Sequence, residues 1–165
     1  MSPWILVTLT LSSIASAVLG GVFLTFSDFV MRSLDRASTS AGVEVMQVIN
    51  REVMHSIFGV LLLSMFALSL LIVGYAGIYL KHPASGLIVA GGMILLIGVF
   101  GVSGAVNVPM NTRLDGMDHA LAEAAFYWKN SYFPKWTFWN HVRVIACLAS
   151  ASCYLVACSW LIQKP

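Results

Sequence analysis

Residues 53–80 read VMHSIFGVLLLSMFALSLLIVGYAGIYL, and none of them is Asp, Glu, Lys or Arg. An α-helix needs about 20 mainly apolar residues to cross the hydrocarbon core of a bilayer. These 28 residues exceed that length. The stretch therefore predicts a transmembrane helix.

Three further stretches share this length and apolar character, and they are Trp4–Phe26, Leu87–Val108 and Phe138–Ile162. Over the whole chain 59% of the residues are hydrophobic and only 10% are charged, whereas soluble proteins carry about 25% charged residues. We therefore expect an all-α fold, a membrane four-helix bundle that forms a single domain over residues 1–165 within the lipid bilayer. The net charge of +2, without a basic stripe, argues against a nucleic-acid partner.

The connections between these helices are unequal. Residues 81–85 form a short turn, whereas residues 27–52 and 109–137 form two long connections on the same side of the membrane. That side carries seven Lys and Arg residues and the other side carries two, so the long connections are predicted to be cytoplasmic and both termini external. Apolar residues at helical spacing predict short interfacial helices in the first connection, split near residues 38–42, and a helical stretch over residues 120–125 in the second.

Polar side chains gather at the four helix ends that meet the long connections. They are Asp28, Gln47, Asn50, Asn107, Asn111, Asn140, His141 and Arg143. Unpaired polar groups are costly in lipid, so we expect these side chains to surround one cavity in one leaflet. Amides both donate and accept hydrogen bonds, which favours a neutral, oxygen-bearing aromatic ligand. The alternative is a set of helix caps and interhelical hydrogen bonds with no space inside.

Helix geometry limits which of these residues can share a cavity. Asn140 and Arg143 are three residues apart on one helical face, whereas His141 lies about 100° further around the helix than Asn140. His141 and Arg143 therefore cannot both point straight into one cavity. The cysteines, Cys147, Cys153 and Cys158, lie in one apolar segment without a CxxC pair, so we interpret them as buried apolar residues and predict no metal site.

Four segments carry a resemblance to a known family. They are TFSDFVM (25–31), MQVINR (46–51), NVPMNTRL (107–114) and WTFWNHVR (136–143). In this order they resemble the anthrone oxygenase-like family of small four-helix integral membrane proteins. The resemblance implies a cofactor-independent monooxygenase in the bacterial inner membrane, and the Lys/Arg asymmetry predicts that its polar site faces the cytoplasm. Such an enzyme uses molecular oxygen to oxidise a hydrophobic aromatic substrate that resembles an anthrone, a polyketide or a quinol.

The resemblance also implies roles for the clustered residues. His141 would remove a proton from an activated methylene of the substrate, and Asp28 would orient His141 or Arg143. Arg143 would stabilise the negative charge that develops, together with the amides that would bind the substrate, namely Gln47, Asn50, Asn107, Asn111 and Asn140. The alternative function is a non-enzymatic subunit of a membrane complex or homo-oligomer, whose polar end binds a partner protein, a lipid or a small molecule such as a quinone.

Overall fold

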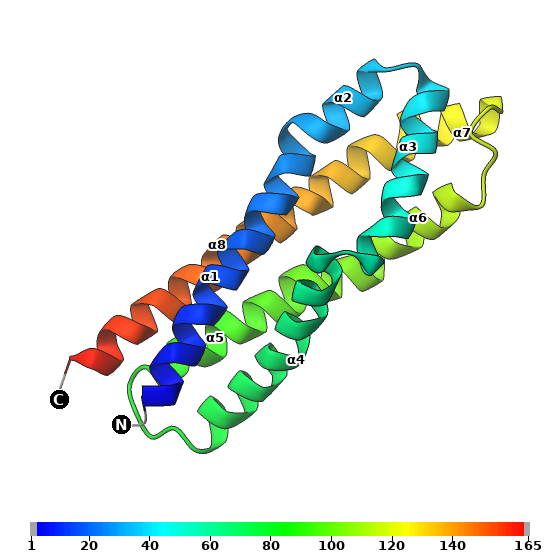
Figure 1. The fold of residues 1–165 in the computed structure, drawn as a ribbon. Helices are drawn as coiled ribbons and strands as arrows, with labels where there is room; N and C mark the ends of the chain where they lie inside the picture. The colour runs from blue at the N-terminus through cyan, green and yellow to red at the C-terminus, as the bar shows by residue number, and fades with distance from the viewer. Residues whose placement is uncertain (1–2, 164–165) are drawn as a thin grey trace.

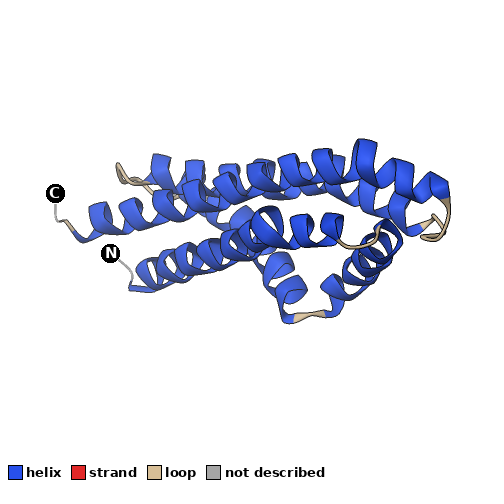
Figure 2. Ribbon diagram, turned by 90° about the horizontal axis from the view of Figure 1, so that it is seen from above, coloured by secondary structure: helices blue, strands red, loops and turns tan. Residues whose placement is uncertain are grey.

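The computed structural model describes residues 3–163, which form helices joined by short loops (Figures 1 and 2). In chain order the α-helices are α1 (Pro3–Thr25), α2 (Met31–Arg36), α3 (Thr39–Glu52), α4 (Ile57–Ile78), α5 (Ser85–Leu95), α6 (Val108–Asp115), α7 (Ala122–Tyr127) and α8 (Phe133–Ile162). The shorter elements are the π-helical segments η1 (Phe26–Val30), η3 (Leu96–Gly101), η4 (Ser103–Asn107) and η5 (Trp128–Tyr132), and the 3₁₀ turn η2 (Val53–His55). The all-α prediction is confirmed.

The π-helical segments continue the α-helices, so the elements join into long helices. The four long helices are Pro3–Arg36, Ile57–Ile78, Ser85–Asp115 and Ala122–Ile162, and each is long and apolar enough to cross a membrane. The membrane four-helix bundle is therefore confirmed. Three of these helices run well beyond the predicted spans, because helical hydrogen bonding continues through the polar residues at which the apolar run stops.

The second spanning helix begins later than its hydropathy predicts. It starts at Ile57 rather than Val53 because Ser56 caps it. The Ser56 Oγ accepts a hydrogen bond from the Gly59 N–H at 3.2 Å and donates one to the Val53 carbonyl at 2.6 Å. This cap satisfies one of the free N–H groups at the helix start and separates α3 and η2 from α4.

The two ends of the bundle differ (Figure 1). Helix α1 begins, helix α8 ends and the short α4–α5 turn lies at one end, whereas α2, α3, α6 and α7 gather at the other. Both long connections thus lie on one side. Ser38 caps α3 after a break at Ala37, which agrees with the predicted split, and α7 (residues 122–127) overlaps the helical stretch predicted at residues 120–125.

Small residues bring the long helices close together. A Cβ atom added at Gly98 would lie only 2.5 Å from the Ala146 Cβ of α8, and one added at Gly20 would lie 3.0 Å from the Cys147 Cβ. Lipid supplies no hydrophobic drive for one helix to bind another, so van der Waals packing between close backbones stabilises such contacts. These positions hold α1 and the α5–η3 helix against α8.

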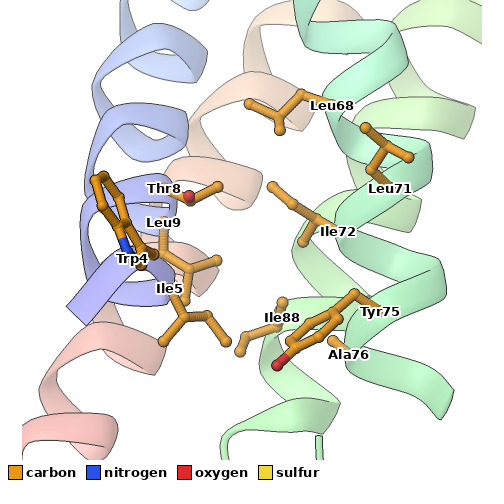
Figure 3. Close-up of a pocket in the computed structure, with 10 residues that line it drawn as sticks. All are labelled: Trp4, Ile5, Thr8, Leu9, Leu68, Leu71, Ile72, Tyr75, Ala76 and Ile88. Atoms are coloured by element: carbon orange, nitrogen blue, oxygen red, sulfur yellow. The ribbon is translucent and has the colours of Figure 1, made fainter. Parts of the chain in front are cut away.

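Helices α1 and α4 separate enough to leave two hollows between them. One, of about 260 Å³, lies near the chain termini. Figure 3 shows it between Trp4, Ile5 and Thr8 on α1 and Leu71 and Tyr75 on α4. The other lies toward α3 and α6, where the polar residues gather.

Candidate functional site

The second hollow is a cavity of about 360 Å³ to which all four long helices contribute. Its walls are mainly apolar, and a few polar groups lie among them. The lining residues are Val22, Phe23, Phe26, Met46, Ile49, Asn50, Glu52, Val53, Met54, Ser56, Phe58, Leu62, Ser103, Asn107, Val108, Asn111, Trp136 and Arg143. Apolar walls with a few placed polar groups are typical of small-molecule sites.

Arg143 on α8 is the cation of this cavity, and only 7% of its surface is exposed. Its guanidinium carbon lies 4.4 Å from the centre of the Phe23 ring and 5.3 Å from that of Trp136. The Nη1 donates to the Ser103 Oγ at 3.2 Å, and the Nη2 donates to the Asn140 Oδ1 at 2.5 Å. The Nε has no hydrogen-bond partner within the described chain.

Asn140 lies behind Arg143 rather than in the cavity wall. Its amide nitrogen donates to the Phe23 carbonyl at 2.6 Å and to the Ser27 Oγ at 2.5 Å. These two bonds fix the side chain so that its oxygen faces the Arg143 guanidinium. Asn140 was predicted to bind substrate, but the structure gives it the role of holding Arg143 in place and tying α8 to the end of α1.

A second group of polar side chains joins α3, α6 and η5. The Asn111 Oδ1 accepts hydrogen bonds from the Tyr132 hydroxyl at 2.8 Å and the Trp136 Nε1 at 2.9 Å. The Asn50 amide nitrogen donates to the Tyr132 hydroxyl at 3.2 Å. Asn50 and Asn111 both line the cavity, so the expected convergence of amides from separate helices is present here.

Asn107 is the least satisfied amide of the cavity. Its Nδ2 donates to the Trp136 carbonyl at 3.4 Å, while its Oδ1 is buried without a partner within the described chain. Gln47, by contrast, does not line the cavity. Its amide nitrogen donates to the Leu114 and Met117 carbonyls, each at 2.8 Å, and so satisfies backbone oxygens where α6 ends.

The structure does not bring His141 or Asp28 to the cavity. The His141 side chain is exposed on α8, because Asn140 and Arg143 face inward and His141 lies about 100° around the helix from Asn140. Asp28 is also exposed, and its carboxylate pairs with the Arg32 guanidinium one turn later at 2.7 Å. The expectation that all eight residues surround one cavity is therefore corrected: Asn50, Asn107, Asn111 and Arg143 line it, whereas Gln47, Asn140, Asp28 and His141 do not.

Sequence reasoning missed Trp136, Ser103 and Phe23. Trp136 precedes Asn140 by four residues and Arg143 by seven, and Ser103 precedes Asn107 by four. These spacings place each of them on the face of its neighbour, so helical periodicity was a usable signal. No such signal marks Phe23, which differs in no way from the other apolar residues of the first span.

Three of the π-helical segments, η1, η4 and η5, lie close to the cavity. Phe26 in η1 and Ser103 and Asn107 in η4 line it, and Tyr132 in η5 hydrogen-bonds to two of the lining amides. Pro109 follows η4 and lies in the first turn of α6. Single π turns within α-helices are frequent at functional sites, which agrees with the cavity as the candidate site.

The chemistry available at the cavity comes from amides, hydroxyls, an indole N–H, a guanidinium and the carboxylate of Glu52. Among residues 3–163, no group of three His, Cys, Asp or Glu side chains is arranged to hold a metal ion. The hydrogen-bond donors among these groups are suited to binding and polarising oxygen substituents on an aromatic ligand.

A family model described as anthrone oxygenase matches residues 46–153, a range that contains most of the cavity's polar side chains. The chain belongs to the anthrone oxygenase family. No curated protein and no solved structure matches the chain. The matched range begins in α3 and ends in α8, so Phe23 and Phe26 are wall residues of this anthrone oxygenase family member that lie outside it.

Proposed function

We propose that this membrane protein oxidises a hydrophobic, anthrone-like aromatic with molecular oxygen in the cavity between α1, α3, α4, η4 and α8. In such a reaction the activated methylene becomes a carbonyl. Two C–H bonds break and one oxygen atom of O₂ forms the new C=O. The second oxygen atom leaves with the two hydrogens as water, so one O₂ is consumed for each substrate oxidised.

The observation that carries this proposal is the composition of the cavity wall within the family's matched range. Aromatic and aliphatic side chains form most of the wall, and Arg143, Asn107 and Asn111 place polar groups in it. A planar aromatic with oxygen substituents fits such a site, because its rings contact the apolar wall while its oxygens meet the donors. The volume of about 360 Å³ falls within the range of small-molecule sites.

The residues of the wall support a carbanion mechanism. Removing a proton from the methylene spreads negative charge onto the substrate's carbonyl oxygen, and donors fixed beforehand stabilise that charge. Arg143 supplies such donors, held in place by Asn140 and Ser103. Since His141 lies outside the cavity, we assign the proton acceptor to Glu52, whose exposed side chain lies in the wall and can pass the proton to water.

Turnover of anthrone by the purified full-length protein in detergent micelles tests this proposal. Wild type should form anthraquinone faster than protein-free micelles do, with one O₂ consumed per anthraquinone. Arg143→Gln should lower the rate by about 100-fold, the usual cost of losing one oxyanion donor. Arg32→Gln removes an exposed arginine and should leave the rate unchanged. A wild-type rate equal to that of empty micelles would refute the proposal.

We further propose that the cavity end faces the cytoplasm of a bacterial inner membrane. The support is the excess of Lys and Arg residues in the two long connections. Figure 1 shows α2, α3, α6 and α7 of these connections together at one end of the bundle, and residues of α3 and α6 line the cavity. Reporter cysteines at Ser40 and Ser85 distinguish the two orientations.

A further inference from the structure

We propose that the ligand binds as an anion: a hydrophobic aromatic with an ionised oxygen group, a carboxylate or a phenolate, whose counter-charge is Arg143. This inference rests on the proposed function only in taking the cavity as the substrate site. It adds a substrate class, since neither the family match nor the amides distinguish a charged ligand from a neutral one.

The supporting observation is a buried cation without an anion. Arg143 is 7% exposed and lies within a spanning helix. The ion pairs that involve Arg or Lys in residues 3–163 are Asp28–Arg32, Asp115–Arg51 and Asp35–Lys129, and none includes Arg143. Ionisable residues inside a membrane are costly and usually pair with one another, so the protein alone leaves the charge of this guanidinium uncompensated.

The neutral neighbours of Arg143 orient it without balancing its charge. The Phe23 and Trp136 rings offer the negative faces of their π-systems, and Ser103 and Asn140 accept one hydrogen bond each. A guanidinium has five N–H donors, so three remain, and the Nε is buried without a partner. Carboxylates and phenolates accept from adjacent guanidinium donors in strong, charge-assisted hydrogen bonds.

Glu52 does not supply the missing charge. It lines the same cavity, but its side chain is exposed and forms no ion pair with Arg143. The wall therefore carries a cation in its buried part and a carboxylate in an exposed part. An anionic group would be attracted by the first and repelled by the second, which favours one orientation of the ligand.

Asn107 adds a second requirement for the ligand, which is a hydrogen-bond donor. Its buried Oδ1 has no donor within the described chain, and a buried acceptor without a partner costs free energy that a ligand hydroxyl would recover. The ligand class that satisfies both residues is a hydroxylated aromatic with one ionised oxygen. This revises the neutral ligand expected from the amides alone.

Binding of matched probes to the full-length protein in nonionic micelles tests the inference, with quenching of tryptophan fluorescence as the readout. Wild type should bind 2-naphthoate at least tenfold more tightly than its neutral isostere 2-naphthamide. Ionised 4-nitro-1-naphthol, compared with its methyl ether, tests the phenolate in the same way. Preference for either anion supports the inference and identifies the group. Equal or weaker binding of both anions overturns it, and this comparison requires no variant.

Variants then assign the preference to its residue. Arg143→Gln should remove the preference for the anion, Arg143→Lys should retain part of it, and Arg32→Gln should retain all of it. An anion preference that persists in a folded Arg143→Gln protein would overturn the inference.

The outcome is separable from that of the proposed function. Preference for the anion without anthrone turnover would leave the ligand class in place and remove the oxidation. Anthrone turnover with equal affinity for charged and neutral probes would support the oxidation and overturn the proposed ligand class.

Discussion

Asn140→Leu is the substitution whose effect follows most directly from the structure. Asn140 is fully buried and makes three side-chain hydrogen bonds, to the Phe23 carbonyl, the Ser27 hydroxyl and the Arg143 guanidinium. Leucine keeps much of the shape and makes none of these bonds. The change therefore leaves a carbonyl, a hydroxyl and one donor of a charged group without their partner.

The magnitude is the sum of these losses. A neutral hydrogen bond contributes about 1 kcal/mol and a bond to a charged group about 2 kcal/mol, which gives about 4 kcal/mol for the three. Interhelical hydrogen bonds in membranes average about 0.6 kcal/mol, because the unfolded chain in a micelle also finds partners. We therefore expect a loss of roughly 2 to 4 kcal/mol in the free energy of unfolding.

Reversible unfolding in mixed micelles of mild detergent and dodecyl sulfate, followed by circular dichroism, measures this loss. Asn130→Leu is the matched control, because Asn130 is exposed and bonds only to the Phe126 carbonyl one turn earlier in its own helix. The control should change stability by less than about 0.5 kcal/mol, as surface substitutions do. If Asn140→Leu costs no more than Asn130→Leu, the hydrogen bonds at the end of α1 do not stabilise the bundle and the reasoning is wrong.

Three further predictions concern packing, the exposed histidine and orientation. Gly98→Val should destabilise the protein by about 1 to 3 kcal/mol through overpacking, because a Cβ at this position would lie 2.5 Å from a methyl group of α8. Gly104→Val is the control and should cost less in the same unfolding assay, because a Cβ there would have no neighbour within 4 Å. His141→Ala should leave both anthrone turnover and thermal stability near wild type, since the side chain lies outside the cavity; a hundredfold loss of turnover in a folded protein would restore its catalytic role. In a background without the native cysteines, a cysteine at Ser85 should react with an external thiol reagent and one at Ser40 should not, and the opposite result would reverse the proposed orientation.

The bundle was predictable from hydropathy because lipid imposes a minimum apolar length on every crossing. The helix boundaries were not, since they depend on hydrogen bonding rather than on transfer to lipid. Ser56 illustrates this: a single hydroxyl ends one helix and caps the next, yet it hardly alters the hydropathy of residues 53–80. The first and third helices likewise continue through polar residues to Arg36 and Asp115.

The location of the site was predictable to the level of one end of the bundle, and its composition only in part. Depth in the membrane follows from sequence position, so the amides of several helices were expected to meet. Direction around each helix is harder to predict: Asn140 faces inward while His141, the next residue, faces outward. Gln47 shows the remaining difficulty, because an inward-facing amide can satisfy the end of a neighbouring helix instead of a ligand.

The π-helical segments have a consequence for how the cavity tolerates changes in chain length. A π turn closes its hydrogen bond over one residue more than an α turn does, so every side chain after it is rotated by about 100° relative to an uninterrupted α-helix. Removing one residue from η4 (Ser103–Asn107) would restore the α-helical register, and because the deletion cancels the extra residue of the π turn, Asn111 would keep its direction toward the cavity. The bundle can therefore lose one residue within such a segment without exchanging the wall residues, whereas deleting one residue from a regular α-helical stretch would rotate every later side chain by about 100°.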